Sequence, residues 1–177
     1  MTIAILLITA AALALIFILG LTISRSLQTS DRRPHAIQPV DVDAFRNLVD
    51  PIETEYLRRR LPASDFRRVQ RERLRATATY VQVAARNAAV LALIGQAALH
   101  AADPQTTEAA RQLVDHALRL RRNAAFALLR IYVALPWPNS SPVAGSVLHG
   151  YQRLNGCAML FGRLQNPAVP LRIFATL

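Results

Sequence analysis

The side chains that most often carry catalysis or bind metals are few in this chain and stand apart. The histidines are His35, His100, His116 and His149; they form no His-x-x-x-His pair, and no Cys-x-x-Cys pair occurs. A zinc site or a nucleophilic centre needs several such side chains at short, fixed spacings, because they must converge on one atom. We therefore predict no catalytic, metal-binding or cofactor-binding residue.

The remaining catalytic motifs are also missing from the sequence. Cys157 is the single cysteine and lies in an apolar stretch, so we expect an inert, buried thiol. No glycine-rich phosphate loop and no Gly-x-Ser-x-Gly motif occurs. All 21 basic residues are arginine, so lysine chemistry, such as Schiff-base formation, is excluded. We expect a protein that is not an enzyme.

Arginine supplies the densest group of charges. The formal net charge is +10, which favours anionic neighbours. Arg67, Arg71 and Arg75 are four residues apart, so they share one face of a helix. Three further arginines follow an apolar segment at residues 3–23. If that segment spans a membrane, an anionic lipid surface would lie close to them. The candidate contacts with an anionic surface are Arg25, Arg32, Arg33, Arg67, Arg71 and Arg75.

Several interpretations of this arginine stripe stay open. It can be a solvated helix face, and the excess of arginine can follow from codon bias. Alternatively, the stripe can contact anionic lipid or the acidic face of a protein partner. Nucleic acid is disfavoured, because the nearest aromatic residues, Phe66 and Tyr80, fall on the apolar side of the predicted helix and we expect them in the core.

The spacing of apolar residues predicts two long helices that hold these arginines. The first follows Ser64, its expected N-cap, and continues to His100. Asp103-Pro104 predicts a sharp turn, after which the second helix runs from about Gln105 to Leu135. Two long helices joined by so short a turn must pack as an antiparallel hairpin. The predicted core positions are Phe66, Val69, Tyr80, Ala84, Ala88, Leu91, Ile94, Ala98, Ala110, Leu113, Ala117, Leu120, Ala124, Leu128, Ile131 and Leu135.

Prolines and glycines shape the segments on either side of the hairpin. In the segment that precedes it, Pro51 either kinks one helix or begins a second one after Asp50. In the segment that follows, residues 143–165 have helical apolar content but contain four glycines. We expect this segment either to pack closely through those glycines or to break into pieces. The apolar tail, residues 166–177, must bury against the bundle, a partner or the bilayer.

The first apolar segment predicts where the protein resides. The run Ile3–Ile23 carries no charge, and its 21 residues would span about 30 Å as a helix, the thickness of the hydrocarbon core of a bilayer. A cleaved signal peptide is the alternative. The apolar stretch of a signal peptide, however, is typically shorter than this one and is preceded by basic residues, which this segment lacks. Because arginines follow the segment and none precedes it, the N-terminus should face out. The stretch after Arg86 is too short for a second span, so we expect it in the core.

We therefore expect an all-α protein with one N-terminal transmembrane helix and a helical-bundle domain built on a long antiparallel αα-hairpin. The expected division is a transmembrane anchor, residues 1–24; a basic juxtamembrane linker, residues 25–40; a cytoplasmic helical domain, residues 41–165; and an apolar C-terminal tail, residues 166–177. The expected function is that of a non-enzymatic scaffold or accessory subunit that binds a protein partner, or a second copy of itself, at the cytoplasmic face of the cell membrane. The alternative is an arginine-rich module that binds anionic lipid.

Overall fold

A computed structural model describes residues 37–138 and 144–165, which are entirely helical apart from turns and connecting segments. They belong to one compact unit, His35–Leu177. The helices are α2 (Val42–Val49), α3 (Pro51–Arg60), α4 (Ala63–Ala98), α5 (Pro104–Ala134) and α6 (Gly145–Gln165). The predicted anchor, most of the linker and the C-terminal tail lie outside the described residues.

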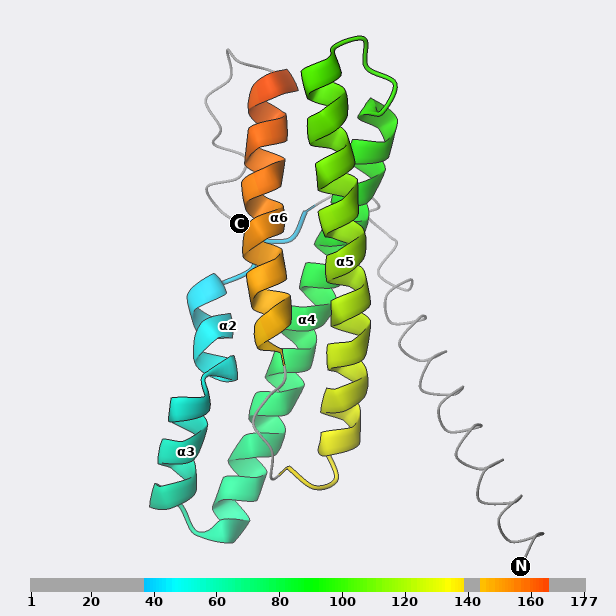
Figure 1. The fold of residues 1–177 in the computed structure, drawn as a ribbon. Helices are drawn as coiled ribbons and strands as arrows, with labels where there is room; N and C mark the ends of the chain where they lie inside the picture. The colour runs from blue at the N-terminus through cyan, green and yellow to red at the C-terminus, as the bar shows by residue number, and fades with distance from the viewer. Residues whose placement is uncertain (1–36, 139–143, 166–177) are drawn as a thin grey trace, which may run out of the picture. The chain divides into compact units, whose positions relative to one another are not determined.

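Helices α4 and α5 lie side by side and run in opposite directions (Figure 1). Asp103 begins α5 by accepting hydrogen bonds from the backbone N–H groups of Gln105 and Thr106, and hydrogen bonding from Thr106 lowers the pKa of its carboxyl group. The two helices approach closely at Gly95, where an added Cβ would lie 2.8 Å from Val114 Cγ2. A glycine is therefore required at this contact.

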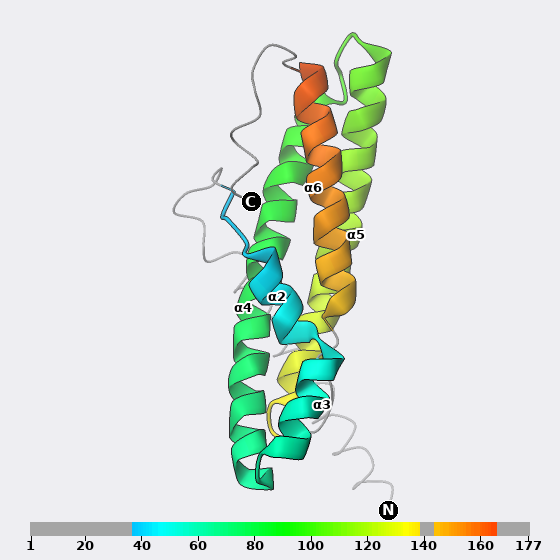
Figure 2. The ribbon, with the colours of Figure 1, turned by 90° about the vertical axis from the view of Figure 1, so that its left-hand side faces the viewer.

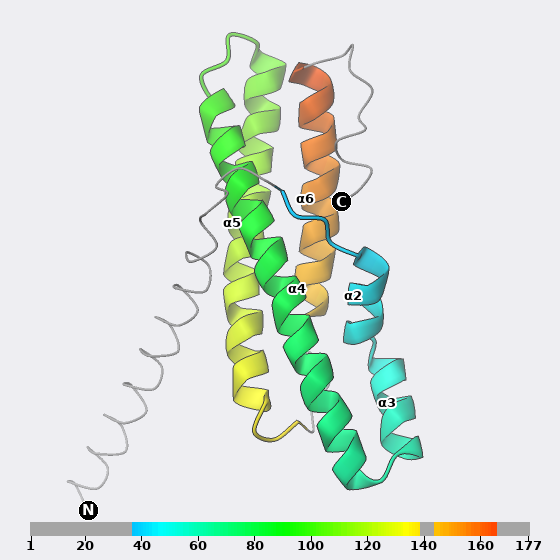
Figure 3. The ribbon, with the colours of Figure 1, turned by 180° about the vertical axis from the view of Figure 1, so that it is seen from behind.

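Helix α6 covers one side of the α4–α5 pair, and Figure 3 shows α4 with α5 and α6 on either side. It is continuous from Gly145 to Gln165, which excludes the second of the two predicted alternatives, a helix broken into pieces. Gly150 packs against α5, since an added Cβ would lie 3.1 Å from Leu120 Cδ1, whereas Gly145 and Gly156 have no neighbour within 4 Å. Close packing therefore uses only one of these three glycines.

The short helices α2 and α3 lie against α4, and α2 also touches α6 (Figure 2). Asp41 caps α2, and Asp50 caps α3 by accepting a hydrogen bond from Ile52 N. Pro51 thus begins a second helix, which was one of the two predicted outcomes. The Phe45 ring of α2 stacks on Tyr80 of α4 at 5.4 Å between centroids, which fixes α2 to the long helix.

Most predicted core positions are buried, with a few differences. Ile94 is 40% exposed, whereas Leu74 and Val81 are buried without having been predicted. The buried face of α4 also carries polar side chains, among them Gln70 and Asn87. Apolar spacing alone does not find such positions, because a polar side chain with hydrogen-bond partners can be buried too. The predicted core residues that are buried are Phe66, Ala84, Ala88, Leu91, Ala98, Ala110, Leu113, Ala117, Leu120, Ala124, Leu128 and Ile131; Val69, Tyr80 and Leu135 are half-buried.

One prediction about α4 was wrong and another needs a qualification. Pro62, not Ser64, holds the N-cap position, and no side chain caps the helix there. The stretch after Arg86 contributes buried core residues, among them Ala88 and Leu91, as predicted, although α4 as a whole is long and apolar enough to cross a membrane by length and composition. Helix α4 begins at Ala63, so it extends well beyond the charge-free stretch after Arg86. Half of the 18-residue apolar stretch that meets these criteria is buried inside the bundle, and the core helix of a soluble protein can meet them too.

Candidate functional site

Two histidines of the described residues line the same hollow. His116 of α5 and His149 of α6 line a depression of about 480 Å³ between these helices, together with Asn123, Arg119 and Arg153. Within the described residues, no group of three or more histidine, cysteine or acidic side chains could hold a metal ion. Among the described residues that line it, the hollow thus combines two histidines with two arginines and no carboxylate.

Cys157 differs from the expected buried thiol. It is half-buried on α6, and partial burial raises the pKa of the thiol, because the thiolate loses solvation. Its side chain lines an apolar groove between the first turns of α5 and the last turns of α6. A raised pKa leaves less thiolate at neutral pH, so the site does not activate this cysteine as a nucleophile.

The candidate arginines Arg67, Arg71 and Arg75 are all exposed on the N-terminal half of α4, while Arg25, Arg32 and Arg33 lie outside the described residues. Arg75 Nη1 pairs with Glu72 Oε1 at 2.6 Å, and Arg67 Nε donates to Ala63 O. Exposed pairs of this kind contribute little to stability and leave the guanidinium accessible. The stripe therefore presents its charge to the exterior of the bundle.

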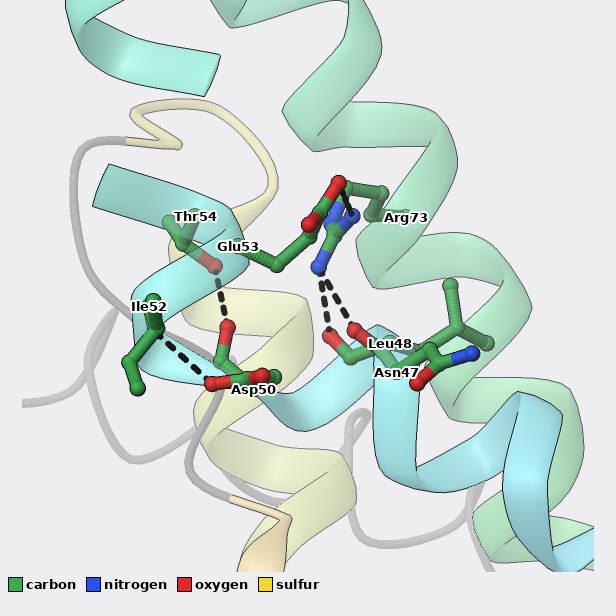
Figure 4. Close-up of polar contacts among 7 residues, drawn as sticks. All are labelled: Asn47, Leu48, Asp50, Ile52, Glu53, Thr54 and Arg73. Carbon is green, nitrogen blue, oxygen red and sulfur yellow. Dashed lines mark hydrogen bonds and ion pairs between the residues drawn. The ribbon is translucent and has the colours of Figure 1, made fainter. Parts of the chain in front are cut away.

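One arginine of this segment has a different position. Arg73 points toward the junction of α2 and α3, where Nη2 donates to Asn47 O at 2.9 Å (Figure 4). Its side chain is only 14% exposed, and Nη1 lies 4.0 Å from Glu53 Oε1. The guanidinium therefore satisfies the last carbonyl groups of α2. Sequence reasoning missed this role because the acceptor is a backbone atom 26 residues away.

Exposed aromatic side chains accompany the charges at one end of the bundle. The α3–α4 turn and the C-terminal end of α5 lie at the same end in all three views (Figures 1–3). Trp137, three residues beyond α5, is 77% exposed, and Tyr56 of α3 is also exposed. The Arg60 guanidinium lies over the Tyr56 ring, 5.7 Å from its centroid. We call Ile52, Tyr56, Arg58, Arg59, Arg60, Arg67, Arg71 and Trp137 the basic end.

A second set of exposed apolar side chains lies on α5. Leu118, Phe126 and Val133 are 50%, 61% and 66% exposed, although the opposite side of the same helix is core. At about 100° per residue, these three positions fall within roughly a quarter turn of one another. Arg122 and Arg130 are exposed one turn on either side of Phe126. We call these five residues the α5 outer face; sequence reasoning, which followed only the buried side of this helix, did not find it.

The fold and these surfaces define a class: an all-α helical bundle whose described residues carry exposed arginines and exposed apolar side chains on separate surfaces. Comparison of the chain with protein-family models, with curated proteins and with solved structures finds no match. The surfaces themselves therefore carry the functional proposal.

Proposed function

We propose that this chain is a membrane-anchored, non-enzymatic scaffold or accessory subunit that binds a protein partner through the α5 outer face. The observation that carries the proposal is the exposure of Phe126 and Val133, at 61% and 66%, on a helix whose other side is fully packed. Large apolar side chains that gather on one exposed face mark interaction sites more often than isolated ones do.

The composition of the α5 outer face supports a protein partner. Protein interfaces are enriched in aromatic residues and arginine, and their energy is concentrated in a few buried anchors. Phe126 would be such an anchor, with Arg122 and Arg130 at its rim. Because Leu120, Ala124 and Ile131 fix the other side of α5 in the core, the face is held rigid before it binds.

The location belongs to the same proposal. Residues 1–24 would anchor the chain in the cell membrane as a single span, with the N-terminus outside and the bundle in the cytoplasm. The anchor would confine the bundle to the membrane surface, where an integral or peripheral membrane protein is the nearest partner. A second copy of the chain is the other candidate, and it would give a homo-oligomer.

The proposal is tested by extracting the full chain from its membrane with mild detergent and identifying proteins that remain bound in fixed stoichiometry. Phe126→Asp should lose the bound protein, because a carboxylate cannot enter an apolar interface without a cost in desolvation. Tyr56→Asp, at the basic end, is the matched control and should retain it. A complex that contains only this chain would identify the partner as a second copy, whereas a monomer without partner would contradict the proposal.

The basic end favours a second candidate function, which is binding to anionic lipid. Trp137 and Tyr56 are the residue types that concentrate at membrane–water interfaces, and the Arg60 guanidinium lies over the Tyr56 ring. Each arginine held near an anionic leaflet contributes on the order of 1 kcal/mol. The exposed side chain of Arg71 on α4 places a further charge where it can contact a lipid phosphate.

Trp137 is the single tryptophan of the chain and so reports on this second candidate directly. We place the full chain in nanodiscs that contain brominated lipids, which quench tryptophan on contact. Lipid binding predicts stronger quenching in anionic than in neutral nanodiscs, and a decrease when salt is raised, because salt screens exposed charges. Quenching that is equally weak in both lipids would exclude this candidate and leave the protein partner.

A further inference from the structure

The hollow of about 480 Å³ between α5 and α6 is lined mainly by side chains that donate hydrogen bonds. Each helix supplies four lining residues, at positions i, i+3, i+4 and i+7, which share one face of a helix. Of the described residues that line it, Leu120 and Gly150 lack a polar side chain. The lining residues are His116, Arg119, Leu120 and Asn123 of α5 and Ser146, His149, Gly150 and Arg153 of α6.

The packing of α5 against α6 brings these two polar faces together. The helices run in opposite directions (Figure 1), and they approach closely where an added Cβ on Gly150 would lie 3.1 Å from Leu120 Cδ1. At this register His116 of α5 lies at the level of Arg153 of α6. Buried neighbours hold both faces in place before a ligand binds. These neighbours are Ala117, Ala124, Val147, Tyr151 and Leu154.

The charge around the hollow is strongly positive. Helices α5 and α6 together contain seven arginines and two acidic residues, Glu108 and Asp115. Glu108 lines the apolar groove at the start of α5 and not this hollow. Asp115 pairs with Arg119, whose Nε donates to Oδ1 at 3.1 Å and whose Nη2 lies 2.9 Å from Oδ2. A guanidinium has more N–H donors than this carboxylate occupies, so Arg119 keeps donors for a ligand. The hollow therefore attracts anions and repels cations.

We propose that this hollow binds a phosphate group, supplied either by phosphate or a phosphate ester in solution or by a lipid headgroup. Ionised phosphate oxygens accept hydrogen bonds, and every polar side chain of the hollow can donate them. Arg119 and Arg153 come from different helices, so two guanidinium groups can approach one phosphate from two sides. A carboxylate has fewer oxygens and would leave more of these donors without an acceptor. The proposal is independent of the proposed function, since no residue of the hollow belongs to the α5 outer face or to the basic end.

The histidines of the full chain report directly on this site. We label histidine with ¹³C, purify the chain in a maltoside detergent and follow the imidazole NMR signals while inorganic phosphate replaces chloride at constant pH and ionic strength. Single histidine-to-glutamine variants assign the signals. We expect saturable shifts of the His116 and His149 signals and none at His100, an exposed histidine of the α4–α5 turn. Equal shifts at all histidines would indicate a general ion effect and would contradict a site in the hollow.

A second arm distinguishes the two sources of phosphate. The same spectra are recorded in phosphatidylcholine nanodiscs with and without phosphatidic acid, whose headgroup is a phosphate monoester. Shifts of the His116 and His149 signals with inorganic phosphate would identify a soluble ligand. Shifts that occur only with phosphatidic acid would identify a lipid headgroup. If neither probe moves these two signals, the proposal is overturned.

Arginine variants test whether the hollow itself holds the phosphate. Arg119→Gln and Arg153→Gln should each weaken binding of the effective probe at least about five-fold, because each removes a charged donor. Arg163→Gln is the matched control, since Arg163 is exposed on the same helix as Arg153 but does not line the hollow. It should leave the affinity unchanged. Unchanged affinity in Arg119→Gln and Arg153→Gln, or an equal loss in Arg163→Gln, would contradict the proposal.

Discussion

Asn87 is the buried side chain that joins three separate parts of the bundle. Its Nδ2 group donates to Gln38 O at 2.7 Å and to Tyr151 Oη at 3.1 Å, and its Oδ1 atom accepts from Gln38 N at 2.9 Å. The segment before α2, the middle of α4 and helix α6 therefore meet at one amide. Tyr151 is completely buried, and this burial raises the pKa of its hydroxyl group.

The Asn87 contact predicts a specific loss of stability. Asn87→Leu should lower the free energy of unfolding by about 2–3 kcal/mol, because it removes both hydrogen bonds to the Gln38 backbone and one of the hydrogen bonds of the buried Tyr151 hydroxyl. Tyr151→Phe should cost about 1 kcal/mol, and Asn87→Leu should cost less in that background. Denaturant unfolding of the wild type, the two single variants and the double variant measures the coupling free energy between the two side chains. Strictly additive losses would show that the two side chains do not interact.

The residues that the sequence predicts best are those whose role depends only on local spacing. In α5, seven of the eight predicted core residues are buried, from Ala110 to Ile131. The pairs of Glu55 with Arg58 and Arg59 also occur as their spacing indicates, at 3.6 and 3.0 Å. Arg73 and Asn87 were not predicted, because their partners are distant in sequence and one partner of each is a backbone group.

Among the helices, the α4–α5 contact depends on the absence of a side chain at Gly95. An added Cβ would meet Val114 Cγ2 at 2.8 Å and the carbonyl oxygen of Ala110 at 3.2 Å. Valine is branched at Cβ and the carbonyl belongs to the helix backbone, so neither can move away easily. The two helices would have to separate locally to accept alanine.

This contact predicts opposite effects for two glycine substitutions. Gly95→Ala should lower the free energy of unfolding by about 1–2 kcal/mol, because overpacking outweighs the gain in helix propensity. Gly156→Ala in α6 is the matched control, because an added Cβ there has no neighbour within 4 Å. It should raise stability by about 0.5–1 kcal/mol. Thermal or denaturant unfolding distinguishes the two, and a stabilising Gly95→Ala would show that the helices are not in close contact there.

Helix boundaries could be predicted where two local signals coincide. Asp50-Pro51 and Asp103-Pro104 each combine an N-cap side chain with a proline suited to the first turn, and both begin helices. Ser64 gave only one signal, and the helix begins at Ala63 without a side-chain cap. The continuity of α6 could not be predicted, because its glycines lower helix propensity and the sequence does not show that α6 packs along α5.

In the bundle as a whole, the candidate surfaces depend on which helices cover one another. Spacing predicts that Arg67, Arg71 and Arg75 share a face of α4. It does not predict that the chain beyond α5, with Trp137, reaches the same end as the distant helix α3 (Figure 1). Nor does it show that α6 leaves Phe126 exposed. These combinations require the tertiary arrangement.

The central claim, that the α5 outer face binds a protein partner, is tested most directly by the ratio of bound partner to chain after mild detergent extraction. Phe126→Asp is compared with Gln152→Asp, which introduces the same charge at an exposed position of α6. We predict a ratio at least about ten-fold lower for Phe126→Asp, as expected when an interface anchor is lost, and an unchanged ratio for Gln152→Asp. Equal ratios for wild type, Phe126→Asp and Gln152→Asp would contradict the claim.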